Sequence, residues 1–281
     1  MHHRYLSMLH DAPVHCEHLR LPTRQGETFV VAAGPAEAPP VVLFHGGGTT
    51  SAMWLRGIGV WSATRRIYAV DIIGEPGLSA PSRPRLTSDA HALWLDDVWR
   101  GLSLSKASAV AASLGGWMAL DYAIRRPANV ERLALLAPIG IGRQRLGTFY
   151  KVLPLLYMGR WGRRKMLDIV MGFDPKEAAS PEGQRLIELA DLVLQHFKFR
   201  NRPMPLFTDE RLRRLTMPVL VVLGGRDAAV DSEQTRRRLA SCLPHAEVHY
   251  LPEAGHALTD QTALIAEFLA RPPSAQPTGG G

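Results

Sequence analysis

The chain has 281 residues, a hydrophobic share of 46% and a net charge of +7 at pH 7, which suits one α/β domain with an inserted cap or two small domains. It has no apolar run near the ~20 residues that span a bilayer, so we expect no transmembrane segment. It has no basic helix with recognition-type spacing and no repeat at a fixed period, so we expect neither nucleic-acid binding nor a solenoid.

The compartment is predicted from the cysteines and the first residues. Cys16, in a predicted strand, and Cys242, in a predicted helix, are too few for a disulfide framework and are expected to be buried thiols. The stretch 1–7 has no apolar signal-peptide core. We therefore expect a cytoplasmic protein.

The first chemical signal in chain order is a glycine-rich turn. The apolar run Pro40–Phe44 is predicted to be a strand, and it ends in His45-Gly46-Gly47-Gly48. Glycines there let the backbone approach a substrate oxygen, and their N–H groups can point at it. His45 is expected to hold this loop rather than to react. The tetrapeptide alone is a weak signal.

A serine in a strand–turn–helix context follows. Ser113 stands between the apolar run 107–110 and the amphipathic stretch 117–126, with Ala111 two residues before it and Gly115 two after. This layout is typical of a nucleophile elbow, where a strained turn exposes the hydroxyl and small neighbours let strand and helix nearly touch. Taken alone, the segment 111–116 is equally consistent with an ordinary turn or a helix N-cap.

Two further strands are predicted to end in an acid and a base. The run 218–223 leads through Gly224 and Gly225 to Asp227, and a short strand near Leu251 leads through a turn to His256. Ser, Asp and His thus come in the order of an α/β-hydrolase triad, each just past a strand. The competing acid, Asp231, is better placed to cap the helix that follows it.

With these parts, the sequence resembles the α/β-hydrolase superfamily from about residue 14 to residue 270. A further match is the stretch 71–79, which looks like the family's Asp-x-x-Gly-x-Gly-x-Ser loop with one extra residue. The chain departs from the usual pattern at Ala111, where the family has glycine. The resemblance implies an α/β fold: a mostly parallel eight-stranded sheet flanked by helices, with an inserted helical cap.

The resemblance also implies roles for individual residues. Ser113 would be the nucleophile, His256 the base and Asp227 the orienting acid, while Gly47 and Leu114 would donate to the oxyanion. No cofactor is implied. No metal is expected either, because His-Glu-x-x-His and Cys-x-x-Cys are both absent.

The positive charge is concentrated in one segment. Residues 141–215 hold 15 Lys and Arg against 8 Asp and Glu, and the rest of the chain is balanced. Because this segment lies between the strand candidates 130–136 and 219–223, it is predicted to be the cap, with 1–140 and 216–270 as the catalytic domain. The tail 271–281 is expected to be disordered.

The cap's apolar stretches 150–158, 166–173 and 184–197 could pack on the catalytic domain and line an acyl pocket. Its basic surplus has three interpretations: a solvated outer face, attraction of an anionic substrate, or docking of an acidic partner such as a carrier protein or a membrane surface.

The favoured function is hydrolysis of a small-molecule carboxylic ester through an acyl-enzyme. Within the enzymes, carbon–carbon bond hydrolases, thioesterases and lactonases stay open, although Ala257 stands where many carbon–carbon bond hydrolases carry tryptophan. The alternative from another class is a low-turnover ligand-binding or receptor protein on the same fold.

Overall fold

Eight strands form one sheet in the order β1-β2-β4-β3-β5-β6-β7-β8 in a computed structural model that describes residues 1–200 and 203–272. The strands β1 and β2, and β2 and β4, pair antiparallel, and the remaining pairs are parallel. The expected fold, a mostly parallel eight-stranded sheet flanked by helices, is therefore confirmed. The strands are β1 (Glu17–Thr23), β2 (Gly26–Ala33), β3 (Pro40–Phe44), β4 (Arg66–Val70), β5 (Ala107–Ala112), β6 (Val130–Leu136), β7 (Val219–Gly224) and β8 (Glu247–Leu251).

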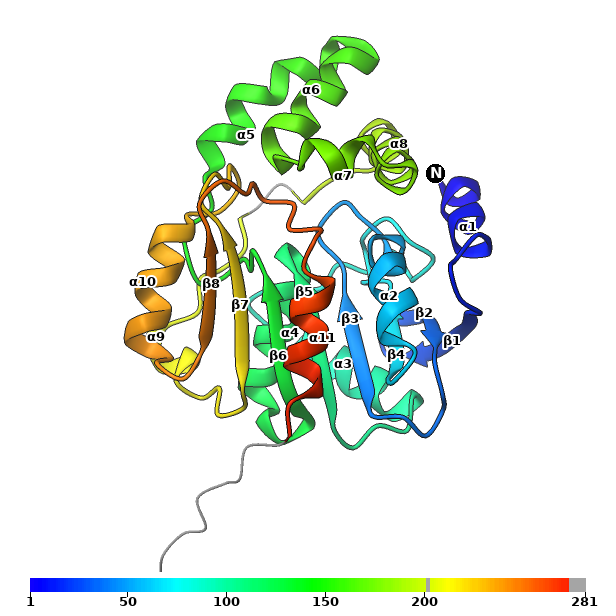
Figure 1. The fold of residues 1–281 in the computed structure, drawn as a ribbon, viewed down its shortest axis with the longest axis vertical. Helices are drawn as coiled ribbons and strands as arrows, with labels where there is room; N and C mark the ends of the chain where they lie inside the picture. The colour runs from blue at the N-terminus through cyan, green and yellow to red at the C-terminus, as the bar shows by residue number, and fades with distance from the viewer. Residues whose placement is uncertain (201–202, 273–281) are drawn as a thin grey trace, which may run out of the picture.

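Helices cover both faces of this sheet (Figure 1). They are α1 (His2–His10), η1 (Ser51–Trp54), α2 (Leu55–Trp61), α3 (Ala90–Gly101), α4 (Ser113–Arg125), η2 (Pro127–Asn129), α5 (Leu146–Val152), η3 (Leu153–Tyr157), α6 (Gly159–Met171), α7 (Pro175–Ala179), α8 (Pro181–His196), α9 (Asp209–Leu212), α10 (Ser232–Cys242) and α11 (Thr262–Ala270). The predicted strands over 40–44 and 130–136 match β3 and β6 to the residue.

The inner strands β3 and β7 are apolar along their whole length because both of their faces are buried. In β3, Val42 and Phe44 join the core under α3, α4 and α10, whereas Val41 and Leu43 join the core under α1, α2 and α11. Since successive side chains point to opposite faces, one short apolar run supplies both cores. The carboxyl ends of the parallel strands consequently meet at one edge, between two layers of helices.

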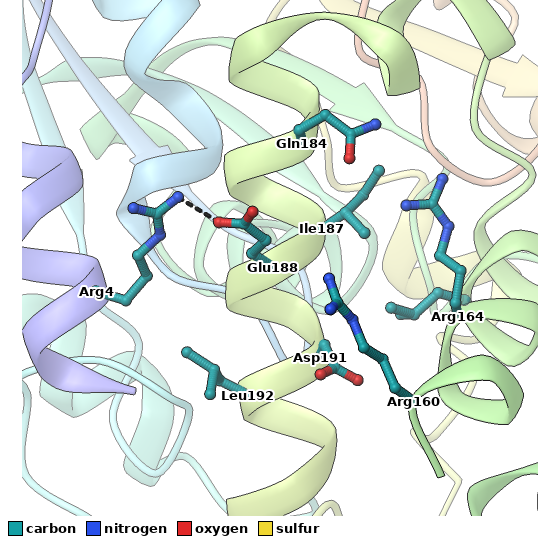
Figure 2. Close-up of a pocket in the computed structure, with 9 residues that line it drawn as sticks. Arg4, Arg160, Arg164, Gln184, Ile187, Glu188, Asp191 and Leu192 are labelled. Atoms are coloured by element: carbon teal, nitrogen blue, oxygen red, sulfur yellow. Dashed lines mark hydrogen bonds and ion pairs between the residues drawn. The ribbon is translucent and has the colours of Figure 1, made fainter. Parts of the chain in front are cut away.

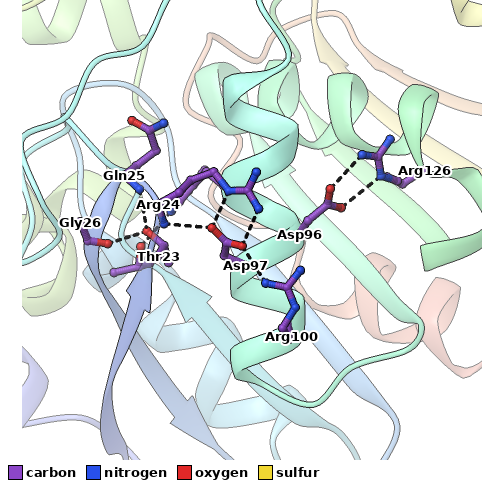
Figure 3. Close-up of polar contacts among 10 residues, drawn as sticks. Thr23, Arg24, Gln25, Gly26, Asp96, Asp97, Arg100 and Arg126 are labelled. Atoms are coloured by element: carbon purple, nitrogen blue, oxygen red, sulfur yellow. Dashed lines mark hydrogen bonds and ion pairs between the residues drawn. The ribbon is translucent and has the colours of Figure 1, made fainter.

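The antiparallel edge is fastened to α3 by charge (Figure 3). The Asp97 carboxylate accepts hydrogen bonds from the backbone N–H and the guanidinium of Arg24, at 2.7–2.9 Å, and from Arg100 at 2.9 Å. These hydrogen bonds, that from the Arg24 side chain foremost, hold the pKa of Asp97 well below its usual value. The β1–β2 turn is thereby tied to the helix that packs under it.

Helices α5 to α8 of the 141–215 segment lie beyond the edge at which Ser113 is placed (Figure 1). Arg56 pairs with Glu177 of α7 at 2.6 Å across the gap to the sheet domain. Helix α8 buries Leu189 and Val193 on one face, and Ile187 on another side that lines the cavity between α1, α6 and α8.

The stretch 150–158 behaves differently from the expectation that it packs inward. Tyr150 is 73% and Tyr157 is 89% exposed, and in α5 and η3 only Val152 is buried. The stretch forms the end of α5 and the short helix η3, because Pro154 has no N–H to continue an α-helix. Tyr150, Leu153, Tyr157 and Met158 therefore face solvent rather than an acyl pocket.

The remaining expectations concern the ends and the cysteines. Arg271 and Pro272 are held by the Arg132 guanidinium, which donates to both carbonyls at 2.6–2.7 Å; the rest of the predicted tail, 273–281, lies outside the described residues. Cys242 ends α10 and is buried, Cys16 lies just before β1 and is half-buried, and both thiols are free. In the described part of the chain no helix is long and apolar enough to cross a membrane.

Candidate active site

Ser113 occupies the sharp turn between β5 and α4. Its φ of 51° is left-handed, a conformation that serine adopts only when the surroundings impose it. A Cβ on Gly115 would lie 2.4 Å from the carbonyl oxygen of Phe44, so glycine is required where α4 passes the end of β3. Ala111, two residues before the serine, is fully buried in β5, where a small side chain is accommodated. The strand, turn and helix expected here are all present.

The three predicted triad residues come together across 143 residues of chain. His256 Nε2 lies 2.9 Å from Ser113 Oγ, and His256 Nδ1 lies 2.8 Å from Asp227 Oδ2. Because the carboxylate can only accept, Nδ1 carries the proton and donates it to Asp227. Nε2 is then free to accept from the serine hydroxyl. His256 and Asp227 are 8% and 1% exposed, so this chain of hydrogen bonds is shielded from water.

Asp227 is fixed by its own loop. Its Oδ1 accepts from the backbone N–H groups of Ala229 and Val230 at 2.7 and 2.9 Å, which leaves Oδ2 for the histidine. The competing Asp231 caps α10 instead, where its side chain accepts from Gln234 N at 2.9 Å. The two carboxylates four residues apart thus have different partners, the histidine for Asp227 and the first turn of α10 for Asp231.

The glycine loop after β3 lies beside the elbow. A Cβ built on Gly46 would be 3.7 Å from Ser113 Cβ, and one on Gly47 would be 3.5 Å from Leu114 Cβ. The fully buried His45 holds this loop: the Ile72 N–H donates to His45 Nε2 at 2.9 Å, so His45 Nδ1 is the protonated nitrogen and donates to the Gly46 carbonyl at 2.8 Å.

Glu75 is a site residue to which the sequence analysis assigned no role. Its buried carboxylate accepts from the Gly48 N–H at 2.9 Å and pairs with Arg200 at 3.4 Å. An acid inside the glycine-containing loop 71–79, facing a second glycine loop, is the signal that could have identified it. The carboxylate holds the glycine loop on the side away from His45.

Arg200 brings a charge from the 141–215 segment into this region. Burial lowers the pKa of its guanidinium, and its Nη2 is buried with no hydrogen-bond partner among the described residues. Nearby, burial and then the charge of Arg200 lower the pKa of His91 to about 4. His91 is therefore neutral at pH 7, with its ring edge-on to Trp117.

Asp71 ties the N-terminal helix to the same loops. Its Oδ1 accepts from the Tyr5 hydroxyl at 2.8 Å and from the N–H and hydroxyl of Ser51 at 3.0 and 2.7 Å, and its Oδ2 accepts from Leu78 N at 2.9 Å. Burial and the neighbouring Asp71 charge raise the pKa of Tyr5 well above its usual value, so Tyr5 stays a donor. The first helix thus supports the loops that flank the serine.

The histidine loop is contacted by the end of α6. The Ala257 N–H donates to the Met171 carbonyl at 2.7 Å, and Gly172, with φ of 56°, ends α6 directly against Gly255. A Cβ on Gly255 would lie 2.4 Å from the Gly172 carbonyl oxygen. Two glycines are therefore needed for the inserted segment to reach the residue that precedes His256.

A cavity of about 440 Å³ lies elsewhere, between α1, α6 and α8 (Figure 2). Charged side chains dominate its walls, with Arg4 paired to Glu188 across it. None of the triad residues lines it. The cavity is therefore separate from the hydrogen-bond chain at the strand ends. No cluster of three or more His, Cys, Asp or Glu side chains suited to a metal ion occurs within the described ranges.

Comparison with known proteins agrees with this geometry. Residues 41–268 match the model of the alpha/beta hydrolase family. The chain is 33% identical over 267 residues to the uncharacterized carboxylesterase nap of Bacillus subtilis, covering 92% of this chain and 87% of that protein. It is 30% identical to the carboxylesterase YbfK of the same organism, covering 88% and 84%. The crystal structure of naproxen esterase (carboxylesterase NP) from Bacillus subtilis superposes with a TM-score of 0.81 at 30% identity, covering 95% and 94%.

Proposed function

Because the chain belongs to the alpha/beta hydrolase family, we propose that it hydrolyses a carboxylic ester of a small molecule, with Ser113 as nucleophile, His256 as base and Asp227 as orienting acid. The observation that carries this proposal is the continuous, buried chain of hydrogen bonds from Ser113 Oγ through His256 to Asp227. Its supports are the strained serine turn and the similarity to two proteins named carboxylesterases.

The reaction follows from the direction of these hydrogen bonds. Ser113 Oγ attacks the ester carbon as His256 Nε2 takes the hydroxyl proton, and Asp227 stabilises the imidazolium that forms. His256 then gives the proton to the departing alcohol, which leaves an acyl group on Ser113. Water attacks this ester in turn, passes one proton through His256 back to Ser113 Oγ, and releases the carboxylic acid.

The oxyanion of each tetrahedral intermediate would be bound by the N–H groups of Gly47 and Leu114. Leu114 lies in the first turn of α4, where N–H groups have no partner in the helix, and the Gly47 N–H makes no hydrogen bond within residues 1–200 and 203–272. One such donor contributes about 3 kcal/mol in the transition state. Glu75 would support this oxyanion site indirectly, because its carboxylate accepts from the N–H of Gly48, the residue that follows Gly47.

We also propose that residues 141–215 are a helical cap on a catalytic domain made of 1–140 and 216–270. The support is the place of α5–α8 beyond the strand ends and the contact of α6 with the histidine loop. The two free thiols support a reducing, cytoplasmic compartment.

The test compares the wild type with Ser113→Ala on 4-nitrophenyl esters from acetate to decanoate. We expect turnover by the wild type, a loss of at least about 10⁴-fold in the variant, and fluorophosphonate labelling of the wild type alone. The acyl chain length that is hydrolysed fastest indicates the size of the acyl pocket. Wild-type protein that neither turns over esters nor reacts with the probe would contradict the proposal and favour a ligand-binding protein.

A second candidate is carbon–carbon bond hydrolysis of a vinylogous diketo acid. The observation in its favour is the half-buried Arg200, whose buried Nη2 has no partner among the described residues and could hold a substrate carboxylate near the glycine loop. Ala257 after the histidine counts against it. Turnover of diketo acids without turnover of esters would select this candidate.

A further inference from the structure

The outer helices of the inserted segment expose an unusual number of large apolar side chains. Between residues 146 and 161, the exposed large hydrophobics are Leu146, Phe149, Tyr150, Leu153, Tyr157, Met158 and Trp161. Tyr157, Tyr150 and Trp161 are 89%, 73% and 63% exposed. We name this surface, together with Lys151 and Lys165, the α5–α6 face. So dense a run of exposed large apolar side chains in two successive helices marks a contact surface rather than ordinary scatter.

The whole basic surplus of the chain lies in the same stretch. Residues 141–167 contain seven Lys and Arg and no Asp or Glu, whereas residues 168–215 contain eight of each kind. Lys151 and Lys165 are exposed and make no ion pair within residues 1–200 and 203–272. The +7 net charge is therefore the charge of the α5–α6 region, and two of its cations are free for an external anion.

The side chains of α6 are sorted by direction. Trp161, Lys165 and Ile169 are four residues apart, so they share one face of the helix, and all three are exposed. Arg163 points the other way and pairs with Asp191 of α8 at 2.6 Å. Arg160 reaches toward α8 as well (Figure 2), so we leave it out of the α5–α6 face. The outer side of α6 thus carries an aromatic ring, a cation and an aliphatic side chain on successive turns.

We propose that the α5–α6 face docks on a membrane surface rich in anionic lipid. Tyrosine and tryptophan favour the headgroup level of a bilayer, where an apolar ring and a polar tip are both satisfied. Each Lys or Arg near an anionic leaflet adds to the attraction, and aromatic residues combined with lysines on one surface are the pattern of interfacial helices. Figure 1 places α5 and α6 at the outermost end of the molecule, where a flat surface can reach them.

The charge pattern argues against a second copy of this chain as the occupant. A two-fold contact would bring one α5–α6 face against the same face of its partner. Since residues 141–167 contain no acidic side chain, cation would then meet cation. An anionic lipid surface instead satisfies both the aromatic rings and the lysines. This inference does not depend on the proposed ester hydrolysis.

Vesicle flotation tests the proposal directly. We expect the full chain to bind phosphatidylcholine vesicles containing phosphatidylglycerol at low salt, to bind pure phosphatidylcholine far more weakly, and to be released as salt increases. The double variant Lys151→Gln/Lys165→Gln should weaken binding by about 25-fold, at about fivefold for each charge. The matched variant Arg85→Gln/Lys106→Gln removes two exposed cations outside the α5–α6 face and should bind like the wild type.

Tryptophan fluorescence identifies the docking face. Trp161 is the one exposed tryptophan, since the other five are at most 5% exposed. Brominated lipids in the anionic vesicles should therefore quench part of the tryptophan emission of the wild type. The Trp161→Phe variant should not show this quenching. Quenching that is unchanged in Trp161→Phe, or vesicle binding that falls equally in both charge variants, would overturn the proposal. Circular dichroism of each variant keeps a folding defect from being read as lost binding.

Three other outcomes would also overturn it. A failure of the folded wild type to bind anionic vesicles at low salt would exclude the lipid surface. Capture by poly-glutamate without vesicle binding would assign the face to an acidic protein. Concentration-dependent dimerisation that Tyr157→Ser abolishes, again without vesicle binding, would assign it to a second copy of the chain.

Discussion

The strand-end site and the α5–α6 face differ in how they hold their side chains: the first buries and pairs them, and the second exposes them. At the strand ends His256, Asp227 and Glu75 are buried, and each is held by two or more hydrogen bonds or ion pairs. On the α5–α6 face, Tyr157 and Trp161 are largely exposed. A buried polar group must be paired where it stands, so the first region fixes its geometry internally. The second region leaves its chemistry available to something outside the molecule.

The largest expected effect separates the two aspartates of the β7–α10 loop. Asp227→Asn should lower kcat by about 10⁴-fold, because an amide favours the wrong tautomer of His256. Asp231→Asn leaves the triad intact, so kcat should stay within about twofold and stability should change by about 1 kcal/mol at most. Ester kinetics and thermal unfolding of both variants make the comparison. Similar kcat values for the two variants would remove Asp227 from the site.

The next prediction contrasts one glycine from each region. Gly115→Ala places a methyl group 2.4 Å from the Phe44 carbonyl oxygen and should cost about 3 kcal/mol of unfolding free energy. Gly147→Ala in α5 meets nothing within 4 Å and should stabilise by up to about 1 kcal/mol. Urea unfolding gives both values. Equal effects would mean that the elbow is no more tightly packed than the outer helix.

The third prediction concerns acid stability. His91 has a folded-state pKa of about 4, below the unfolded value of about 6.5, so the unfolded chain binds the proton first. The stability that the neutral His91 contributes is fully present above pH 6.5 and is lost as pH falls toward 4. The loss in unfolding free energy is about 2–3 kcal/mol.

The variant His91→Phe should remove this dependence of the unfolding free energy on pH between pH 6.5 and 4, as measured by urea unfolding at several pH values. His10→Gln changes an exposed histidine at the end of α1 and is the control. A slope that persists unchanged in His91→Phe would place the acid sensitivity elsewhere.

The smallest effect tests the support of the glycine loop. Glu75→Gln keeps an acceptor for the Gly48 N–H but weakens the pairing with Arg200, so we expect kcat to fall about tenfold with KM nearly unchanged. Glu177→Gln, which breaks the outer pair with Arg56, should alter neither constant. A raised KM at constant kcat would show that Glu75 acts on substrate binding instead.

Local sequence was informative wherever chemistry and backbone geometry coincide. Pro40–Phe44 and Val130–Leu136 were placed to the residue because an inner parallel strand is a short, mainly apolar run that is bounded by turn residues. The strained turn at Ser113 was recognisable from its small neighbours, and the Asp231 cap from its position before a helix. These features depend on residues close together in the chain.

Contacts between distant segments could not be read in the same way. Glu75 gained its role from Gly48 and from Arg200, 125 residues later, and His91 became a buried neutral group beside Trp117. The stretch 150–158 was apolar enough to predict inward packing, yet it faces solvent, because hydrophobicity alone does not say which side of an inserted segment meets the domain.

By itself the sequence determined the order in which Ser113, Asp227 and His256 follow their strands, and its resemblance to a known family implied the eight-stranded α/β framework. Periodicity and turn chemistry are local, and parallel strands bring their carboxyl ends to one edge regardless of detail. Only the tertiary structure decided the hydrogen-bond chain, the second support of the glycine loop and the exposure of the α5–α6 face. Those depend on which surfaces meet, and that is set by the packing of the whole chain.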